Sequence, residues 1–214
     1  MAYSTPAGTS FYISQTFAAA KVVTGVTNAN PALATSVAHG YVDDNEVLFV
    51  SGWELASNTV FRVDEQSADT FQLKGLNATN TNRFNTGSGV GNAYLVSAWI
   101  EIPQVLTISP SGGDARIITI NPIKLQQGIN LPDGFNPATV GMGIGFDPAV
   151  ANWETLLDIS RSQTLVAYKS VKGSGAASYG YGYFQMAEQP NQASGQVDTV
   201  NATVLLQGRP ISYA

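Results

Sequence analysis

The 214-residue sequence is defined first by the side chains that it lacks. It contains no cysteine, which excludes a disulfide framework, thiolate catalysis and cysteine-based zinc sites. Its single histidine is His39, so a Ser–His–Asp hydrolase would have to be built around that residue. The chain has no Gly-x-Ser-x-Gly segment of the kind that presents a nucleophilic serine. We therefore interpret His39 as a structural residue of a turn, and we predict neither a catalytic site nor a metal site.

Charged side chains are also scarce. Asp, Glu, Lys and Arg make up 12% of the chain, about half of the usual share. Since a soluble monomer normally depends on surface charge, we expect part of this surface to be covered by a second copy. The alternative is a surface formed by Asn, Thr, Ser and Gln. The net charge of −5 and the lack of any basic cluster argue against a protein that binds nucleic acid specifically.

No apolar run approaches the length of about 20 residues that a membrane span needs, so we expect no membrane association. Residues 1–6 contain neither the basic nor the apolar region of a secretory signal. The sequence therefore predicts a protein that is made in the cytoplasm.

Short runs of β-forming residues, separated by Gly, Asn, Pro and Asp, dominate the sequence and predict a mainly β protein. We expect strands 104–108 and 115–120 to form a hairpin through the turn at 109–114. The other predicted strands are 46–50, 59–63, 70–74, 93–102, 138–146, 164–171, 177–186 and 199–207.

Three of these strands follow one another at intervals of about 11 residues, which is typical of a small β meander. A turn-rich segment precedes them and a polar segment follows them. We therefore predict that residues 26–86 form a small inserted β subdomain. Residues 1–25 and 87–214 would then form the main domain.

A flexible glycine-rich loop is expected where the inserted subdomain ends. It is a candidate assembly loop that becomes ordered when copies associate, and it consists of Gly87, Ser88, Gly89, Val90 and Gly91. Neither this loop nor the glycine-rich segments 141–145 and 173–175 match a phosphate-binding motif. The sequence therefore predicts no nucleotide cofactor.

One amphipathic helix is predicted after the strand at 138–146. Asp147 can cap it, and Pro148 suits its first position, where a missing N–H costs nothing. Apolar residues then recur at helical spacing and should pack on a sheet. These residues are Val150, Trp153, Leu156 and Leu157.

The densest acidic cluster consists of Asp43, Asp44 and Glu46. Two carboxylates could serve a glycosidase, and carboxylate oxygens could bind calcium. No EF-hand spacing is present, however, and an Asp-Asp-Asn sequence before a strand is ordinary turn chemistry. We favour the turn.

Tyr179, Tyr181 and Tyr183 alternate with glycine and should share one face of a strand. Such a row of rings could stack on a sugar, as in a carbohydrate-binding module. It could equally cover a core or a contact with a neighbouring subunit. The alternating glycines favour close packing, so we prefer the second interpretation.

The order of several segments is similar to that of a known family. Trp-Ile-Glu-Ile-Pro-Gln-Val at 99–105 leads into Gly-Gly-Asp-Ala-Arg-Ile-Ile-Thr-Ile at 112–120. A Pro-Asp-Gly turn at 132–134 and a helix containing Trp-Glu-Thr-Leu-Leu at 153–157 follow. Val-Asn-Ala-Thr-Val-Leu-Leu-Gln-Gly-Arg-Pro at 200–210 closes the pattern. Over about two thirds of its length, the chain resembles the lambda-like tail tube proteins of long-tailed bacteriophages.

The resemblance implies a β-sandwich or barrel-like subunit with one flanking helix. Six copies would close into a ring, and stacked rings would form the hollow tail tube of the virion. The implied partners are further copies, the tape measure protein, the tail terminator and the tail tip proteins. DNA would only pass through, and an acidic lumen would repel it. The rival interpretations are a receptor-binding β module of a virion fibre and the tube of a contractile secretion system, with an enzyme last.

Overall fold

The computed structural model describes residues 7–214 and is mainly β with one helix, as predicted. Residues 1–6 carry the expectation about a secretory signal and belong to the predicted main domain. They lie outside the described residues.

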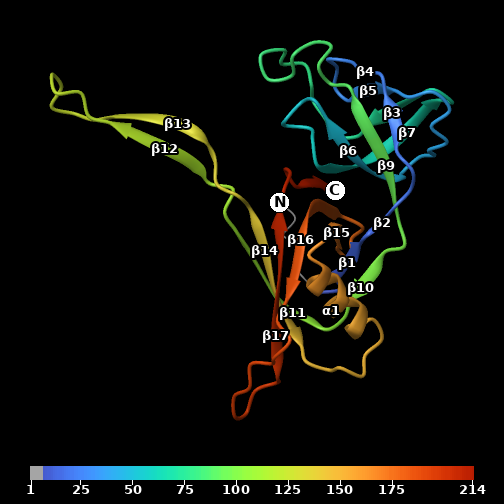
Figure 1. The fold of residues 1–214 in the computed structure, drawn as a ribbon, viewed down its shortest axis with the longest axis vertical. Coiled ribbons are helices and arrows are strands. Elements are labelled where there is room, and N and C mark those ends of the chain that lie inside the picture. The colour runs from blue at the N-terminus through green and yellow to red at the C-terminus, as the bar shows by residue number, and fades with distance from the viewer. Residues whose placement is uncertain (1–6) are drawn as a thin grey trace.

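The first of two large antiparallel sheets carries the helix on one face (Figure 1). Its strand order is β10-β1-β15-β16-β17-β14-β11. β18 pairs with the first residues of β16, along the same edge of β16 as β17. We name it the main sheet. Its strands are β1 Ser10–Ser14, β10 Ile100–Ile102, β11 Val105–Ser111, β14 Thr139–Gly145, β15 Leu165–Val171, β16 Ala177–Met186, β17 Thr199–Leu206 and β18 Ile211–Tyr213.

The second sheet closes on itself. Its order is β2-β9-β6-β7-β8-β5-β4, and β3 also pairs with β9. β3 pairs with β9, and β4 pairs with β5. Because only Thr24 separates β3 from β4, the two act as one strand between β9 and β5 and complete a small barrel. Its strands are β2 Thr16–Phe17, β3 Lys21–Val23, β4 Gly25–Val26, β5 Ala32–Thr35, β6 Glu46–Ser51, β7 Thr59–Ser67, β8 Thr70–Leu73 and β9 Gly91–Ser97.

The small barrel takes strands from both sides of residues 26–86, so β2, β3 and β9 lie outside the predicted subdomain. The division into an inserted unit and a main domain stays a prediction. Each sheet has its own buried cluster, and a third cluster lies between the sheets. The helix and the small barrel therefore lie on opposite faces of the main sheet.

Two strand predictions were wrong in detail. The strand expected over 93–102 is interrupted at Ala98, whose φ of 52° is left-handed, and it divides into β9 and β10. The hairpin expected between 104–108 and 115–120 does not form, because β11 pairs with β14 instead. The strands at 46–50, 59–63, 70–74 and 177–186 are confirmed.

The segment at 115–120 lies instead in a long two-stranded projection. β12 (Ala115–Ile120) pairs with β13 (Ile129–Phe135), beyond the end of the β11–β14 pair. The chain bends at Gly112, where φ is 75° and a Cβ would lie 2.0 Å from the Pro137 carbonyl oxygen. We name residues 112–137 the arm. Figure 1 shows it extending away from the body of the subunit.

The predicted turn at Pro132-Asp133-Gly134 is also wrong, since these residues lie inside β13. Gly134 has a φ of 87°, close to the shift of register between Ala115 and Ile117. The glycine thus accommodates a bulge within a strand and does not end the strand.

The helix begins later than predicted. α1 spans Trp153–Ser162, and Pro148 lies in a preceding turn and not at the first helical position. Asp147 caps that turn, because its Oδ1 accepts a hydrogen bond from the Ala149 N–H at 3.1 Å. The residue before the helix is Asn152, which is left-handed and makes no side-chain cap.

The apolar side of α1 faces the main sheet. Trp153, Leu156 and Leu157 are buried there together with Ile159. Val150, which the sequence places on the same helical face, lies in the turn before the helix and is half-buried.

The glycines of β16 allow the strands to approach closely. A Cβ at Gly182 would lie 2.0 Å from the Leu205 carbonyl oxygen, so a strand must shift to admit it. We expect Gly182→Ala to lower the free energy of unfolding by about 3 kcal/mol. Gly25→Ala is the matched control, because its Cβ would meet nothing within 4 Å. Equal denaturant midpoints for the two variants would refute this account of β16.

Candidate functional site

The arm presents one predominantly aliphatic face. Ile118 is paired with Leu131, and Ile120 is paired with Ile129. Side chains at paired positions share a face of a two-stranded ribbon. Each of the four is about half exposed, between 45% and 50%. We name these four residues the aliphatic face of the arm.

The opposite face of the arm is more polar, since Thr119 donates a hydrogen bond to the Asn130 side chain at 2.9 Å. The tip carries Ile123 and Leu125, which are fully and half exposed, respectively. Every residue of β12 and β13 is exposed. An isolated two-stranded hairpin is at best marginally stable in water, and exposed aliphatic residues in such a row mark a contact surface.

The small barrel covers only part of the predicted tyrosine row, which consists of Tyr179, Tyr181 and Tyr183. Tyr179 is buried between the sheets with Leu48 and Val60. Tyr181 is half-buried, with its ring edge-on to Phe17 at 6.0 Å. Tyr183 is half-buried beyond the barrel. The three rings therefore do not form an exposed platform for a sugar.

A buried ionic cluster fixes the small barrel to the main sheet. Glu46 of β6 accepts from the Lys169 ammonium of β15 at 3.1 Å and from the Tyr179 hydroxyl at 2.8 Å. Arg62 donates to the same hydroxyl at 2.9 Å. The side chains of Glu46 and Lys169 are only 16% exposed. Burial and the neighbouring Glu46 carboxylate raise the pKa of Tyr179. We name Glu46, Arg62, Lys169 and Tyr179 the ionic cluster.

The predicted acidic cluster separates into different contacts. Asp43 accepts from the Glu65 backbone N–H at 2.8 Å, and Asp44 pairs with Lys74 at 3.1 Å. Glu46 belongs to the ionic cluster. Within residues 7–214, no three acidic or histidine side chains lie together in a way that could hold a metal ion.

Both nitrogens of His39 make structural contacts. Its Nδ1 accepts from the Tyr41 backbone N–H at 2.9 Å, and its Nε2 lies 2.9 Å from the Ser67 carbonyl oxygen. The carbonyl can only accept, so Nε2 carries the proton. The ring is buried beside Tyr41 and Phe71, which is the environment of a core residue.

The candidate assembly loop is held within the subunit. The Val90 carbonyl oxygen accepts from the Gly52 N–H at 2.9 Å, and the Gly89 carbonyl oxygen accepts from the Ser51 hydroxyl at 3.1 Å. Gly89 also lies against the Trp53 ring. A role in assembly stays a prediction for this loop, which comprises Gly87, Ser88, Gly89, Val90 and Gly91.

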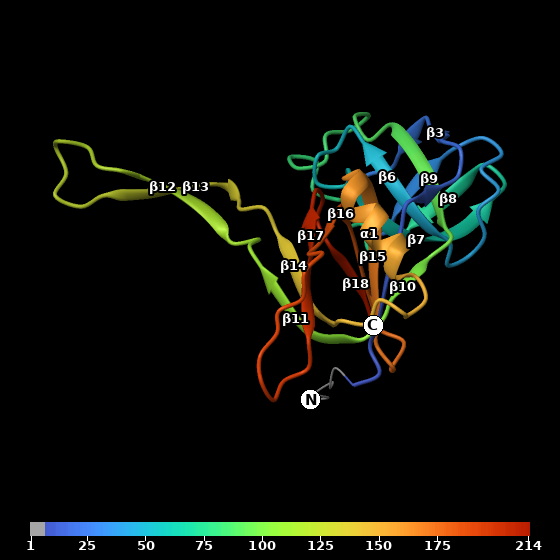
Figure 2. The ribbon, with the colours of Figure 1, turned by 60° about the horizontal axis from the view of Figure 1, so that its bottom comes forward.

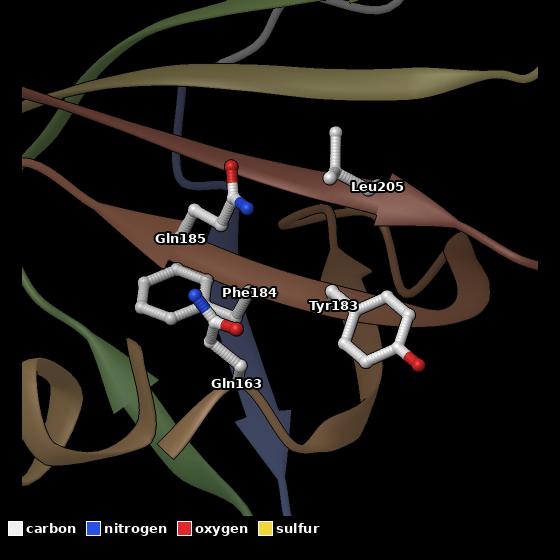
Figure 3. A pocket seen from close by; sticks show the side chains of 5 residues that line it. All are labelled: Gln163, Tyr183, Phe184, Gln185 and Leu205. Carbon is white, nitrogen blue, oxygen red and sulfur yellow. The ribbon is translucent and has the colours of Figure 1, made fainter. Parts of the chain in front are cut away.

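A shallow pocket of about 290 Å³ lies near the end of α1. Figure 3 shows the side chains that line it. Its lining contains amide, aromatic and aliphatic side chains but no charged group and no histidine. Apart from one tyrosine hydroxyl, the lining therefore offers no general acid or base. The lining residues are Gln163, Tyr183, Phe184, Gln185 and Leu205.

The stability of the small barrel should depend on alkaline pH. Burial raises the pKa of Tyr41 from 10.0 to about 12, so unfolding favours its ionisation. The stabilisation is fully present below pH 10 and is lost as the pH rises towards 12. Between about pH 9 and pH 11, the free energy of unfolding should fall by about 1.3 kcal/mol more in the native chain than in Tyr41→Phe, which has no group to ionise. An identical pH dependence in the two proteins would contradict this assignment.

A mainly β subunit with an exposed aliphatic arm has the properties of a protein that assembles with other copies. The model of the phage tail tube protein family matches residues 51–214, and the chain belongs to this family. Its role is therefore structural, as a component of a phage tail tube. No curated protein matches the sequence. No helix among residues 7–214 is long and apolar enough to cross a membrane.

Proposed function

We propose that copies of this chain close into rings of six, and that these rings stack into a hollow lambda-like tail tube that delivers DNA. The observation that carries the proposal is the arm, whose aliphatic face has no cover within the subunit. The tube protein would be made in the host cytoplasm and incorporated into the virion. It would have no enzymatic activity and no cofactor.

Burial of the arm against a second copy would be a substantial source of binding energy. Covering the exposed half of each of its four aliphatic side chains contributes about 1 kcal/mol per residue. The four together amount to about 4 kcal/mol, or nearly a thousandfold in an association constant. A tail tube consists of many copies of one chain, so a second copy is the partner that this surface fits best.

The arm also favours a contact between unlike surfaces. A projecting ribbon and the surface that receives it differ, so the contact is heterologous and can close a ring or continue along an axis. The free edges of β10 and β11 offer further positions for pairing between copies. The ends of the tube would contact the tape measure protein, the tail terminator and the tail tip proteins. The small barrel would be an inserted subdomain on this tube subunit.

Sedimentation equilibrium over a range of concentrations tests the ring. One subunit has a mass of 22.5 kDa, so a ring of six has about 135 kDa, which is 6 × 22.5 kDa. We expect this species or multiples of it to replace the subunit as concentration rises. A protein that stays at 22.5 kDa throughout, or that forms a closed dimer, would contradict the proposal.

A further inference from the structure

Four adjacent strands of the main sheet contain no charged residue. They are β11, β14, β17 and β16. Their register places Ser109, Gly141, Thr203 and Gln185 in one row across the sheet. Thr107, Gly143 and Asn201 form the next row. We name the surface of these two rows the neutral face.

The neutral face points away from α1. On the same strands, Met142, Phe184, Val200 and Ala202 alternate with it and are buried in the cluster that contains the helix. The small barrel contacts β16 at Tyr179, beyond this part of the sheet. No residue of the neutral face is buried, so it is an uncovered sheet surface (Figure 2).

The composition of the neutral face argues against burial between subunits. Its side chains are hydroxyls and amides, and burying such groups without hydrogen-bond partners costs free energy. A subunit interface usually has an apolar or aromatic centre instead. The aliphatic face of the arm has that character, and the neutral face does not.

The lack of charge equally distinguishes the neutral face from an ordinary outer surface. On the opposite side of the subunit, the exposed part of α1 carries Glu154, Asp158 and Arg161. Charged groups of this kind keep an outer surface soluble and resist association. A hydrated surface without charged groups therefore suits neither a subunit interface nor an ordinary outer surface.

We propose that the neutral face lines the DNA channel of the tube. This inference rests on the proposed function. A wall of Lys or Arg would bind phosphates by releasing counterions, and a wall of carboxylates would repel the duplex. Hydroxyl and amide groups exert neither force and retain a layer of water, along which a DNA duplex can slide. The proposal replaces an acidic lumen with a neutral one.

Single cysteines can locate this face in assembled tubes, because the chain has no cysteine of its own. Thr203→Cys and Ser109→Cys place a thiol in the neutral face, and Thr155→Cys places one on the exposed side of α1. Tubes would be treated with a biotin maleimide and then with streptavidin, which is too large to enter a narrow channel. The same variants, labelled and then dissociated, show that streptavidin can bind each biotin.

We expect biotin on the two neutral-face thiols in intact tubes, with streptavidin binding only after dissociation. The Thr155→Cys tubes should bind streptavidin while intact. Streptavidin binding along intact Thr203→Cys and Ser109→Cys tubes would place this face outside and overturn the proposal. Thiols that resist even the small maleimide would place it between subunits and also overturn it. A wild-type chain that forms no tubes refutes the proposed function instead, so the two failures are distinguishable.

Discussion

Replacing Ile118 and Leu131 together by threonine is expected to raise the concentration needed for assembly about 30-fold. Each substitution removes aliphatic surface that contributes about 1 kcal/mol when the arm is covered by a second copy. The combined loss of about 2 kcal/mol corresponds to that factor. Threonine keeps the branched side chain that suits a strand, and the arm lies outside all three buried clusters. Pelleting assays across a concentration series measure the change.

The opposite face of the same arm provides the matched control. Thr119→Ala with Asn130→Ala removes the hydrogen bond between these side chains and leaves the aliphatic face intact. This pair should change the assembly concentration by less than about threefold. Circular dichroism should show that both double variants retain the folded body. Equal effects of the two pairs would mean that the aliphatic face does not mediate assembly.

Substitution of Lys169 by methionine is expected to destabilise the subunit by about 3 kcal/mol, because it leaves the Glu46 carboxylate without its cation in a buried site. For a chain of this size, the loss should lower the melting temperature by about 6 to 12 °C. Differential scanning calorimetry below the assembly concentration measures it. Adding Glu46→Gln to Lys169→Met should recover most of the loss, because the unpaired carboxylate is then gone and Arg62 keeps its hydrogen bond to Tyr179.

An exposed ion pair serves as the control for this prediction. Arg161 and Glu188 lie 2.8 Å apart with side chains 51% and 57% exposed. Because water screens such pairs, Arg161→Met should leave the melting temperature nearly unchanged. If Lys169→Met and Arg161→Met proved equally mild, the ionic cluster would not be what fixes the small barrel to the main sheet.

Local patterns predicted the elements that depend on neighbouring residues. The alternation of Tyr179, Gly180, Tyr181 and Gly182 was sufficient to define β16 over its full length. The spacing of Trp153, Leu156 and Leu157 predicted α1, although its start was placed too early. Proline at 148 suits a first helical turn and also suits the separate turn in which it lies.

The arm could not be recognised from the sequence because its strands have the composition of core strands. Ile117, Ile118 and Ile120 indicate a buried strand, but hydrophobicity does not reveal whether the same chain or another copy covers them. Gly112 and Gly113 suggested a hairpin turn, whereas their left-handed conformations bend a longer ribbon. The ionic cluster was missed for another reason, since Glu46 and Lys169 are 123 residues apart.

Negative-stain electron microscopy of the purified chain, at low and high concentration, tests the tail tube account most directly. The account predicts single subunits and rings at low concentration, and hollow tubes of uniform width at high concentration. Isolated subunits at every concentration, or solid filaments without a channel, would contradict it.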